Sequence, residues 1–338
     1  MSPSILIVVA VLVFITAVYY YLKESGKLKS GSDGVNEYSE NVTQLARDGE
    51  LEAFRGRQEE LKRMIRILMR KTKNNPLLLG EAGVGKSAIV HGLAKKIVNE
   101  EVPEDLQDAV VLEIELYTLL SGTKYRGEFE SRLQKLMDTI RDPESKIIMF
   151  IDEIHLIEKM GTSEGALSIT DVLKPQLAGT NMQLIGATTW KEYQEFIKPN
   201  EPLDRRFQPI LVEEPDEKQA REILLGIKEE YENFHGVDIT DDAAKKAVKL
   251  AHEEIEIRNL PDSAIDLIDE AATKVSIDAE REHHLAGGIV HAAAKDKNQD
   301  EDDRERQNAA EVAVDDIQEV VDHWHPVKSE GEQSQENG

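Results

Sequence analysis

One stretch decides the fold of this chain: Pro76-Leu-Leu-Leu-Gly80-Glu-Ala-Gly-Val-Gly-Lys86-Ser87. A short apolar run leads directly into the pattern G-x-x-x-x-G-K-S, and a helical pattern follows from Ala88. This is the phosphate-binding loop in the setting that it requires, between a buried strand and a helix N-terminus. Glycines let the loop turn its backbone N–H groups inward. The loop residues predicted to bind a nucleotide are Gly80, Glu81, Ala82, Gly83, Val84, Gly85, Lys86 and Ser87.

A second motif, Ile147-Ile-Met-Phe-Ile-Asp152-Glu153, supplies two carboxylates at the end of another apolar run. We expect Lys86 to reach the β- and γ-phosphates, and Ser87 and Asp152 to hold Mg²⁺. Glu153 is expected to orient or deprotonate the attacking water. The two motifs together predict ATP and Mg²⁺ as cofactors and Glu153, Asp152 and Lys86 as catalytic residues.

Two further polar segments follow the phosphate loop and the acidic pair. The run from Leu184 ends in Thr188 and Thr189, either of which could hydrogen-bond the γ-phosphate or the attacking water. Arg205 and Arg206 come just before the last predicted strand. Arginine suits the γ-phosphate of a neighbouring subunit because it stays charged and offers a planar fork of donors. The alternative is that both arginines are ordinary charged surface residues, and their spacing in the sequence does not decide between the two roles.

Outward from these motifs, apolar runs alternate with helical patterns. The runs cover residues 76–79, 110–116, 146–151, 182–186 and 209–212. They lack two-residue alternation, which indicates strands covered on both faces. We therefore expect an α/β fold with a five-stranded, largely parallel sheet between helices. After Pro215 only helical patterns continue, which predicts a smaller helical domain.

The N-terminus is apolar. Residues 5–22 form a run of 18 residues without a formal charge, about the minimum for a helix that crosses a bilayer. Lys23, Lys27 and Lys29 follow it, so the positive-inside tendency places the rest of the chain on the cytoplasmic side. We expect a single-pass membrane anchor, and a buried core helix is the alternative.

Composition excludes several classes of protein. The formal net charge is −25, which disfavours nucleic acid as a partner. The chain has no cysteine, which rules out disulfide scaffolds, cysteine-based metal centres and thiol catalysis. The histidines near the C-terminus show no metal-ligand spacing and are interpreted as surface residues.

Six motifs in this order resemble the first ATPase domain of the Clp/ClpB-type AAA+ unfoldases. They are GEAGVGKSAIV, KYRGEFESRL, FIDEIH, IGATT with a following EY, RRFQPI and LPDSAIDLIDEAA, between Gly56 and Ala279. The resemblance implies a P-loop AAA+ αβα sandwich with a helical lid, working as a homo-hexamer. The expected organisation is an anchor at 1–23, a tether and lead-in helix at 24–50, the large ATPase subdomain at 51–214, the lid at 215–280, an acidic linker at 281–311, the strand and helix that end the lid at 312–326 and a disordered tail at 327–338.

The resemblance also implies residue roles. Thr189 would be the sensor, and Arg205 and Arg206 would reach the adjacent subunit's ATP. Arg57 would help to close the base pocket. The loop residues expected to grip a translocating polypeptide are Lys124, Tyr125 and Arg126. From the residues alone, Tyr125 could equally pack at the start of a helix. A second pore loop is expected at 159–165.

The chain departs from the family pattern at two positions, where Ser263 replaces a lysine and His91 stands before Gly92. Their effect on turnover stays open. A second ATPase domain is missing, so the resemblance implies a single-ring form. The function predicted is a membrane-anchored, ATP-dependent unfoldase or disaggregase-like chaperone that acts on unfolded or misfolded proteins. The alternatives are an ATP-gated membrane scaffold or switch, and the motor of a two-component protease with a separate peptidase or adaptor.

Overall fold

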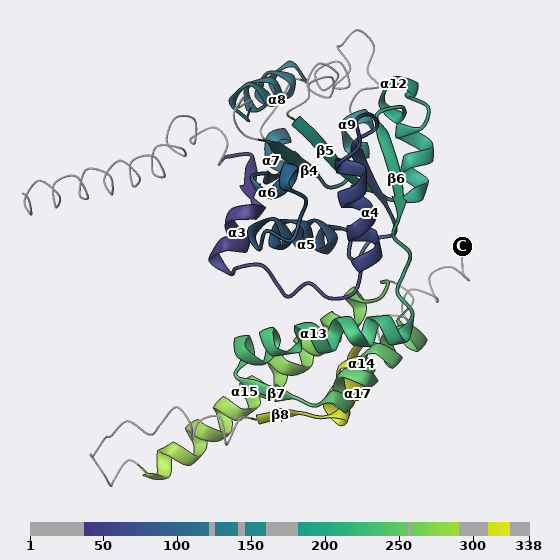
Figure 1. Cartoon of the computed structure of the whole chain (residues 1–338). Helices are drawn as coiled ribbons and strands as arrows, with labels where there is room; N and C mark the ends of the chain where they lie inside the picture. Colours follow the sequence, from purple (N-terminus) through teal and green to yellow (C-terminus); the bar gives the residue numbers. More distant parts are fainter. Residues whose placement is uncertain are drawn as a thin grey trace, which may run out of the picture.

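The structure is a computed structural model that describes residues 37–121, 126–140, 146–159, 182–255, 258–290 and 310–324. An α/β lobe comes first, and a mostly helical lobe follows it (Figure 1). The strands of the first lobe are β1 (Ser39–Asn41), β2 (Asn75–Leu79), β3 (Val110–Ile114), β4 (Ile147–Ile151), β5 (Met182–Thr188) and β6 (Phe207–Leu211).

The strands form one sheet in the order β1-β3-β4-β5-β2-β6. The five parallel strands confirm the predicted sheet. The prediction missed β1, which adds an antiparallel edge to β3 and makes the sheet six-stranded. Only Ser39 of β1 is buried, so its three residues carry no apolar pattern that would mark them as a strand.

Helices cover both faces of the sheet. One face packs against α3 (Val42–Asp48), α4 (Gln58–Leu68), α5 (Lys86–Val98) and α6 (Glu104–Gln107). The other packs against α7 (Leu116–Leu120), α8 (Arg126–Ile140), α9 (His155–Lys159), η2 (Tyr193–Ile197) and α12 (Glu201–Asp204), with α11 (Trp190–Glu192) leading into η2. In β2, Leu78 joins the first core, whereas Leu77 and Leu79 join the second. This two-sided burial explains why the strands read as continuous apolar runs.

The second lobe contains α13 (Glu217–His235), α14 (Asp241–Glu254), α15 (Asp262–Val290) and α17 (Val314–Trp324). A short parallel sheet joins β7 (Val237–Ile239) to β8 (Ala310–Val312), and this pairing corrects the expectation of strand-free structure between residue 215 and the end of α15. α13 begins at a capping box between Asp216 and Gln219 and ends at Gly236 in a left-handed conformation. Ile317, Val320 and Val321 of α17 are buried in the lobe's core.

The two lobes touch beside the phosphate-binding loop. The side chain of Asn259 donates to the carbonyl oxygen of Ala82 at 3.0 Å. The backbone N–H of Leu260 donates to the carboxylate of Glu214 at 2.8 Å. A side chain in place of Gly83 would put its Cβ 2.7 Å from the Cβ of Asp262. The second lobe is therefore a lid in direct contact with the loop.

Within the described ranges, none of the helices is both long and apolar enough to cross a membrane. The predicted anchor at residues 1–23 lies outside these ranges. The same holds for Lys124 and Tyr125, for most of the second predicted pore loop and for the tail at 327–338.

Candidate nucleotide-binding site

The phosphate-binding loop joins β2 to α5 through backbone that glycine allows. Gly83 and Gly85 have φ values of 78° and 93°, in the region that side chains disfavour. Gly80 lies so close to the residue that follows β6 that a Cβ at position 80 would lie 2.3 Å from the carbonyl oxygen of Val212. α5 begins at Lys86, so its unpaired N–H groups and positive dipole end open onto the loop.

Lys86 and Ser87 lie where the predicted chemistry needs them. Lys86 is only 6% exposed, and its ammonium donates to the carbonyl oxygens of Gly80 at 3.0 Å and Glu81 at 2.9 Å. The hydroxyl of Ser87 donates to Oδ2 of Asp152 at 3.4 Å. A hydroxyl beside a carboxylate is the oxygen-rich ligand set that Mg²⁺ prefers. The residues present therefore fit a magnesium-bound triphosphate.

A cavity of about 380 Å³ lies between the loop and the lid. Lys86, Ser87, Asp152 and Glu153 line its polar side. Its apolar side comes from Ile223, Ile227, Pro261 and Ile265 of the lid, and Glu52, Ala53 and Arg55 complete it. The sequence analysis missed these lid residues, because an amphipathic helix face looks the same whether it lines a cavity or packs in a core.

Glu153 is held in a tight turn after β4. Its φ is 49°, and its N–H donates to Oδ1 of Asp152 at 2.9 Å. The next N–H, of Ile154, donates to the carbonyl oxygen of Ala187 in β5 at 3.0 Å. Burial, and then the negative charges of Asp152 and Glu192, raise the pKa of the Glu153 carboxyl. A raised pKa makes this carboxylate a better proton acceptor, as a general base requires.

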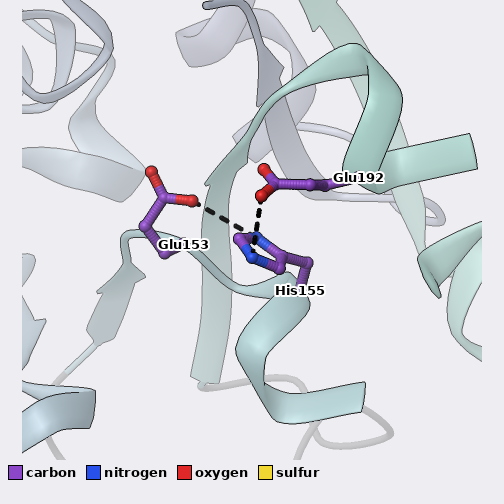
Figure 2. Close-up of side chains that lie close together, drawn as sticks. All are labelled: Glu153, His155 and Glu192. Carbon is purple, nitrogen blue, oxygen red and sulfur yellow. Dashed lines mark ion pairs between the residues drawn. The ribbon is translucent and has the colours of Figure 1, made fainter. Parts of the chain in front are cut away.

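His155 lies between two carboxylates, one from each side of its ring (Figure 2). Nδ1 is 3.2 Å from Oε2 of Glu153, and Nε2 is 3.0 Å from Oε1 of Glu192. The three side chains have potential metal-ligand atoms within 4.8 Å of one another. The sequence analysis did not find this cluster.

The two predicted sensor threonines differ in their contacts. Thr189 caps α11, and its hydroxyl exchanges hydrogen bonds with Glu192. Thr188 is fully buried at the end of β5, where its hydroxyl contacts Nδ1 of His155 at 3.0 Å. Neither threonine is among the residues that line the 380 Å³ cavity. A sensor role for Thr189 stays a prediction.

Arg57 braces the loop. Its guanidinium donates to the carbonyl oxygens of Val84 at 2.8 Å and Glu213 at 2.7 Å, and it pairs with Glu60 at 3.1 Å. Arg55, two residues earlier, lines the cavity, whereas Arg57 is not among its lining residues. The expectation that Arg57 helps to close the pocket for the nucleotide's base therefore stays a prediction.

Arg205 and Arg206 lie at the other end of the sheet from Lys86. They line a cavity of about 720 Å³ beside the first residues of β2 and β5. A five-residue strand is about 16 Å long, so these arginines do not share the loop's cavity. α12, which ends just before them, lies at the end of the sheet far from the lid (Figure 1).

The remaining predicted residues have fewer described contacts. Arg126 begins α8, and Lys124 and Tyr125 precede it outside the described residues. Nε2 of His91 lies 3.9 Å from the carboxylate of Glu113. Ser263 is fully buried and donates to the carbonyl oxygen of Asn259 at 3.3 Å, next to the contact between the lid and the loop.

Comparison with known proteins gives matches over both lobes. Residues 76–213 match the "ATPase family associated with various cellular activities (AAA)", and residues 216–320 match the "AAA lid domain". The chaperone protein ClpB of Clostridium perfringens is 47% identical over 243 residues, which are 72% of this chain and 28% of that protein. The ClpA homolog of Guillardia theta, an ATP-binding subunit of the ATP-dependent Clp protease, is 47% identical over 75% of this chain and 31% of its own length.

A solved structure, the closed state of Hsp104 with ATPγS and FITC casein, has a TM-score of 0.71 and 34% identity. It matches 86% of this chain and 45% of the Hsp104 chain. This chain spans less than a third of the length of either curated relative above.

Proposed function

The chain belongs to the AAA family of ATPases and carries a AAA lid domain, and from this premise we propose that it uses ATP hydrolysis to unfold or remodel other proteins. The observation that carries the proposal is the 380 Å³ cavity, in which the loop, the acidic pair and the lid meet. Loss of the γ-phosphate would therefore change the contacts between the nucleotide and the lid directly. The relative ClpB is a chaperone, and the Hsp104 structure contains casein, which supports protein as the substrate class.

The chain's own groups divide the hydrolytic work. The N-terminus of α5 and Lys86 hold the phosphates, and Glu153 orients the attacking water and takes its proton. Ser87 and Asp152 would hold the magnesium ion, which neutralises charge on the phosphates when it is bound. Asn259 and Asp262 connect the loop to the lid, so that the nucleotide state sets the position of the lid.

We further propose that six copies form a ring in which Arg205 and Arg206 serve the neighbouring copy's nucleotide. The support is their location, because they lie at the end of the sheet opposite to the loop of their own chain. Electron microscopy of a Glu153→Gln variant with ATP tests this proposal. Six-fold rings are expected, and particles that stay single at saturating ATP would contradict it.

The substrate-gripping proposal concerns Tyr125, with Lys124 and Arg126 beside it. An aromatic ring offers apolar faces to any passing side chain and so grips without sequence preference. Tyr125→Ala is expected to abolish unfolding of a model substrate while ATP hydrolysis persists. Unchanged unfolding by this variant would exclude pore gripping. Ring formation and hydrolysis without any unfolding by the wild type would favour an ATP-gated scaffold or switch instead.

We also propose that residues 5–22 anchor the chain in a membrane, with the ATPase domain on the cytoplasmic side. The support is the length of the uncharged run and the lysines that follow it. The full-length chain is expected to stay with vesicles after extraction at high pH, whereas a variant that starts at residue 37 is released. Release of the full-length chain would contradict the anchor.

A second candidate function is the motor of a two-component protease. The 47% identity to a ClpA homolog, named as a subunit of a protease, favours it. The two functions differ in one measurement, the loss of a folded substrate over time when a separate peptidase is added. ATP-dependent degradation would support the protease motor, and unfolding without degradation would support the chaperone.

A further inference from the structure

His155 joins the ends of two neighbouring strands through its side chain. The ring is 4% exposed and stands two residues after Glu153, in the first turn after β4. Nδ1 lies 3.2 Å from Glu153, on β4's side, and Nε2 lies 3.0 Å from Glu192, which follows β5 (Figure 2). Nδ1 also lies 3.0 Å from the hydroxyl of Thr188. Because the buried ring has close polar neighbours at both nitrogens, it has little freedom to turn.

Glu192 is itself fixed by the backbone around it. Its Oε2 accepts from the hydroxyl of Thr189 at 2.8 Å, from the N–H of Thr189 at 3.3 Å and from the hydroxyl of Thr188 at 3.2 Å. The bond from the N–H of Thr189, together with the bond from the N–H of Glu192 to the hydroxyl of Thr189 at 3.2 Å, forms a capping box at the start of α11. Only Oε1 remains for His155. An unbroken chain of contacts therefore runs from Thr189 through Glu192 and His155 to Glu153.

Glu153 needs such support. A glutamate side chain has several free torsions, and fixing them costs conformational entropy. Oε2 of Glu153 lies 3.2 Å from Nδ1 of His155, and the other carboxylate oxygen points away from the ring (Figure 2). Glu153 also lines the nucleotide cavity. The geometry thus leaves one oxygen for the water and uses the other as an anchor.

We propose that His155 and Glu192 are positioning residues for ATP hydrolysis. His155 holds Glu153 so that its second oxygen faces the nucleotide, and Glu192 locks the imidazole in that orientation. This inference rests on the proposed role of Glu153 as the base. It also gives the end of β5 a direct link to the base, so a shift at Thr189 moves Glu153 through two side chains.

The first test is steady-state ATP hydrolysis by the full chain, with kcat expressed per nucleotide-binding site. His155→Leu is expected to lower kcat by about 10- to 100-fold, because a misplaced reacting group costs rate of that order. KM for ATP should change by less than about twofold, since Lys86 and the loop are untouched. His155→Asn keeps a donor near the place of Nδ1 and is expected to recover most of the loss.

The second test is a double-mutant cycle between His155→Leu and Glu192→Gln. If Glu192 acts through the imidazole, Glu192→Gln lowers kcat in the wild type but has little further effect once His155 is leucine. Effects that multiply would overturn the relay. Should the leucine variant not fold, the same cycle is run with His155→Ala, which also removes both ring nitrogens.

A matched control is available in the lid, where Nε2 of His235 pairs with Asp269 at 2.6 Å. His235→Asn and Asp269→Asn remove a similar histidine–carboxylate pair outside the cavity, so they should lower the melting temperature and leave kcat unchanged. A folded His155→Leu protein with wild-type kcat would refute the inference while leaving the ATPase itself in place. A wild type that fails to hydrolyse ATP would instead refute the role of Glu153.

Discussion

A cavity lies at each end of the central sheet, and these two cavities differ in what surrounds them. At the carboxyl ends of the strands, the loop, the acidic pair and the lid enclose about 380 Å³. At the other end, about 720 Å³ is lined by Arg70, Lys71, Lys73, Lys146, Arg205 and Arg206, with Asp105 as the one acidic residue among the described lining residues. In a chain of net charge −25, this second cavity is a local concentration of positive charge.

The difference indicates that the two cavities suit different ligands. The first cavity has a glycine loop and a helix N-terminus, which suit the phosphates of a nucleotide. The second has long cationic side chains and no such loop, so it suits an anion that another molecule presents. Burial lowers the pKa of Lys146, and an anion in this cavity would stabilise the charged form.

The largest effect is expected at the carboxyl end. Glu153→Gln removes the base and should lower kcat by about 100-fold or more, while ATP binding persists because Lys86 and Ser87 remain. Steady-state hydrolysis and equilibrium nucleotide binding measure the two effects. Glu195→Gln, at an exposed position in η2, is the matched control and should hydrolyse ATP at the wild-type rate.

The second prediction breaks the other end. A variant with both Arg205→Ala and Arg206→Ala should lose at least about tenfold in kcat, because an arginine in trans stabilises the charge of phosphoryl transfer. Mixing it with Lys86→Ala subunits should restore activity, since intact loops then meet intact arginines of the neighbour. Absence of recovery on mixing, with rings formed, would show that the arginines act within their own subunit. Arg281→Ala, at an exposed position in α15, serves as control.

The third prediction concerns the lid. Among the described lining residues, lid residues line the 380 Å³ cavity and none lines the 720 Å³ cavity. Asn259→Ala removes the 3.0 Å hydrogen bond to the loop carbonyl of Ala82. A lost hydrogen bond of about 1 kcal/mol corresponds to roughly a fivefold fall in kcat/KM. ATPase titrations measure it. An equal fall for Asp238→Asn, in β7 of the lid, would point to general destabilisation instead.

The smallest effect is on stability. The pKa of Glu153 is raised by burial and by Asp152 and Glu192, so the fold favours its neutral form. Its stabilising contribution is present at low pH and is lost as the pH rises through the raised pKa. Glu153→Gln should therefore raise the melting temperature at pH 8 by a few °C, on the order seen when functional strain is removed, and by less at pH 5. Thermal unfolding at the two pH values checks this, and a gain larger at pH 5 would contradict it.

The sequence predicted β2, β4 and β5 because both of their faces are buried, which leaves continuous apolar runs. The runs at β3 and β6 also predicted strands, although these two are partly exposed. It predicted the phosphate loop because the glycine positions are required within a few consecutive residues. It missed β1 and β7, which have three residues each. Such short strands form because a partner strand is already in place, and their own residues carry little signal.

The candidate site divides in the same way. Lys86, Ser87, Asp152 and Glu153 stand in contiguous motifs whose chemistry is visible residue by residue, so sequence alone determined the nucleotide end. The contact of His155 with Glu192, the lid wall of the cavity and the gathering of Lys146 with Arg206 depend on residues far apart in the chain. Only the tertiary structure decided these, because the distance between such residues is set by how strands and helices pack and not by any local pattern.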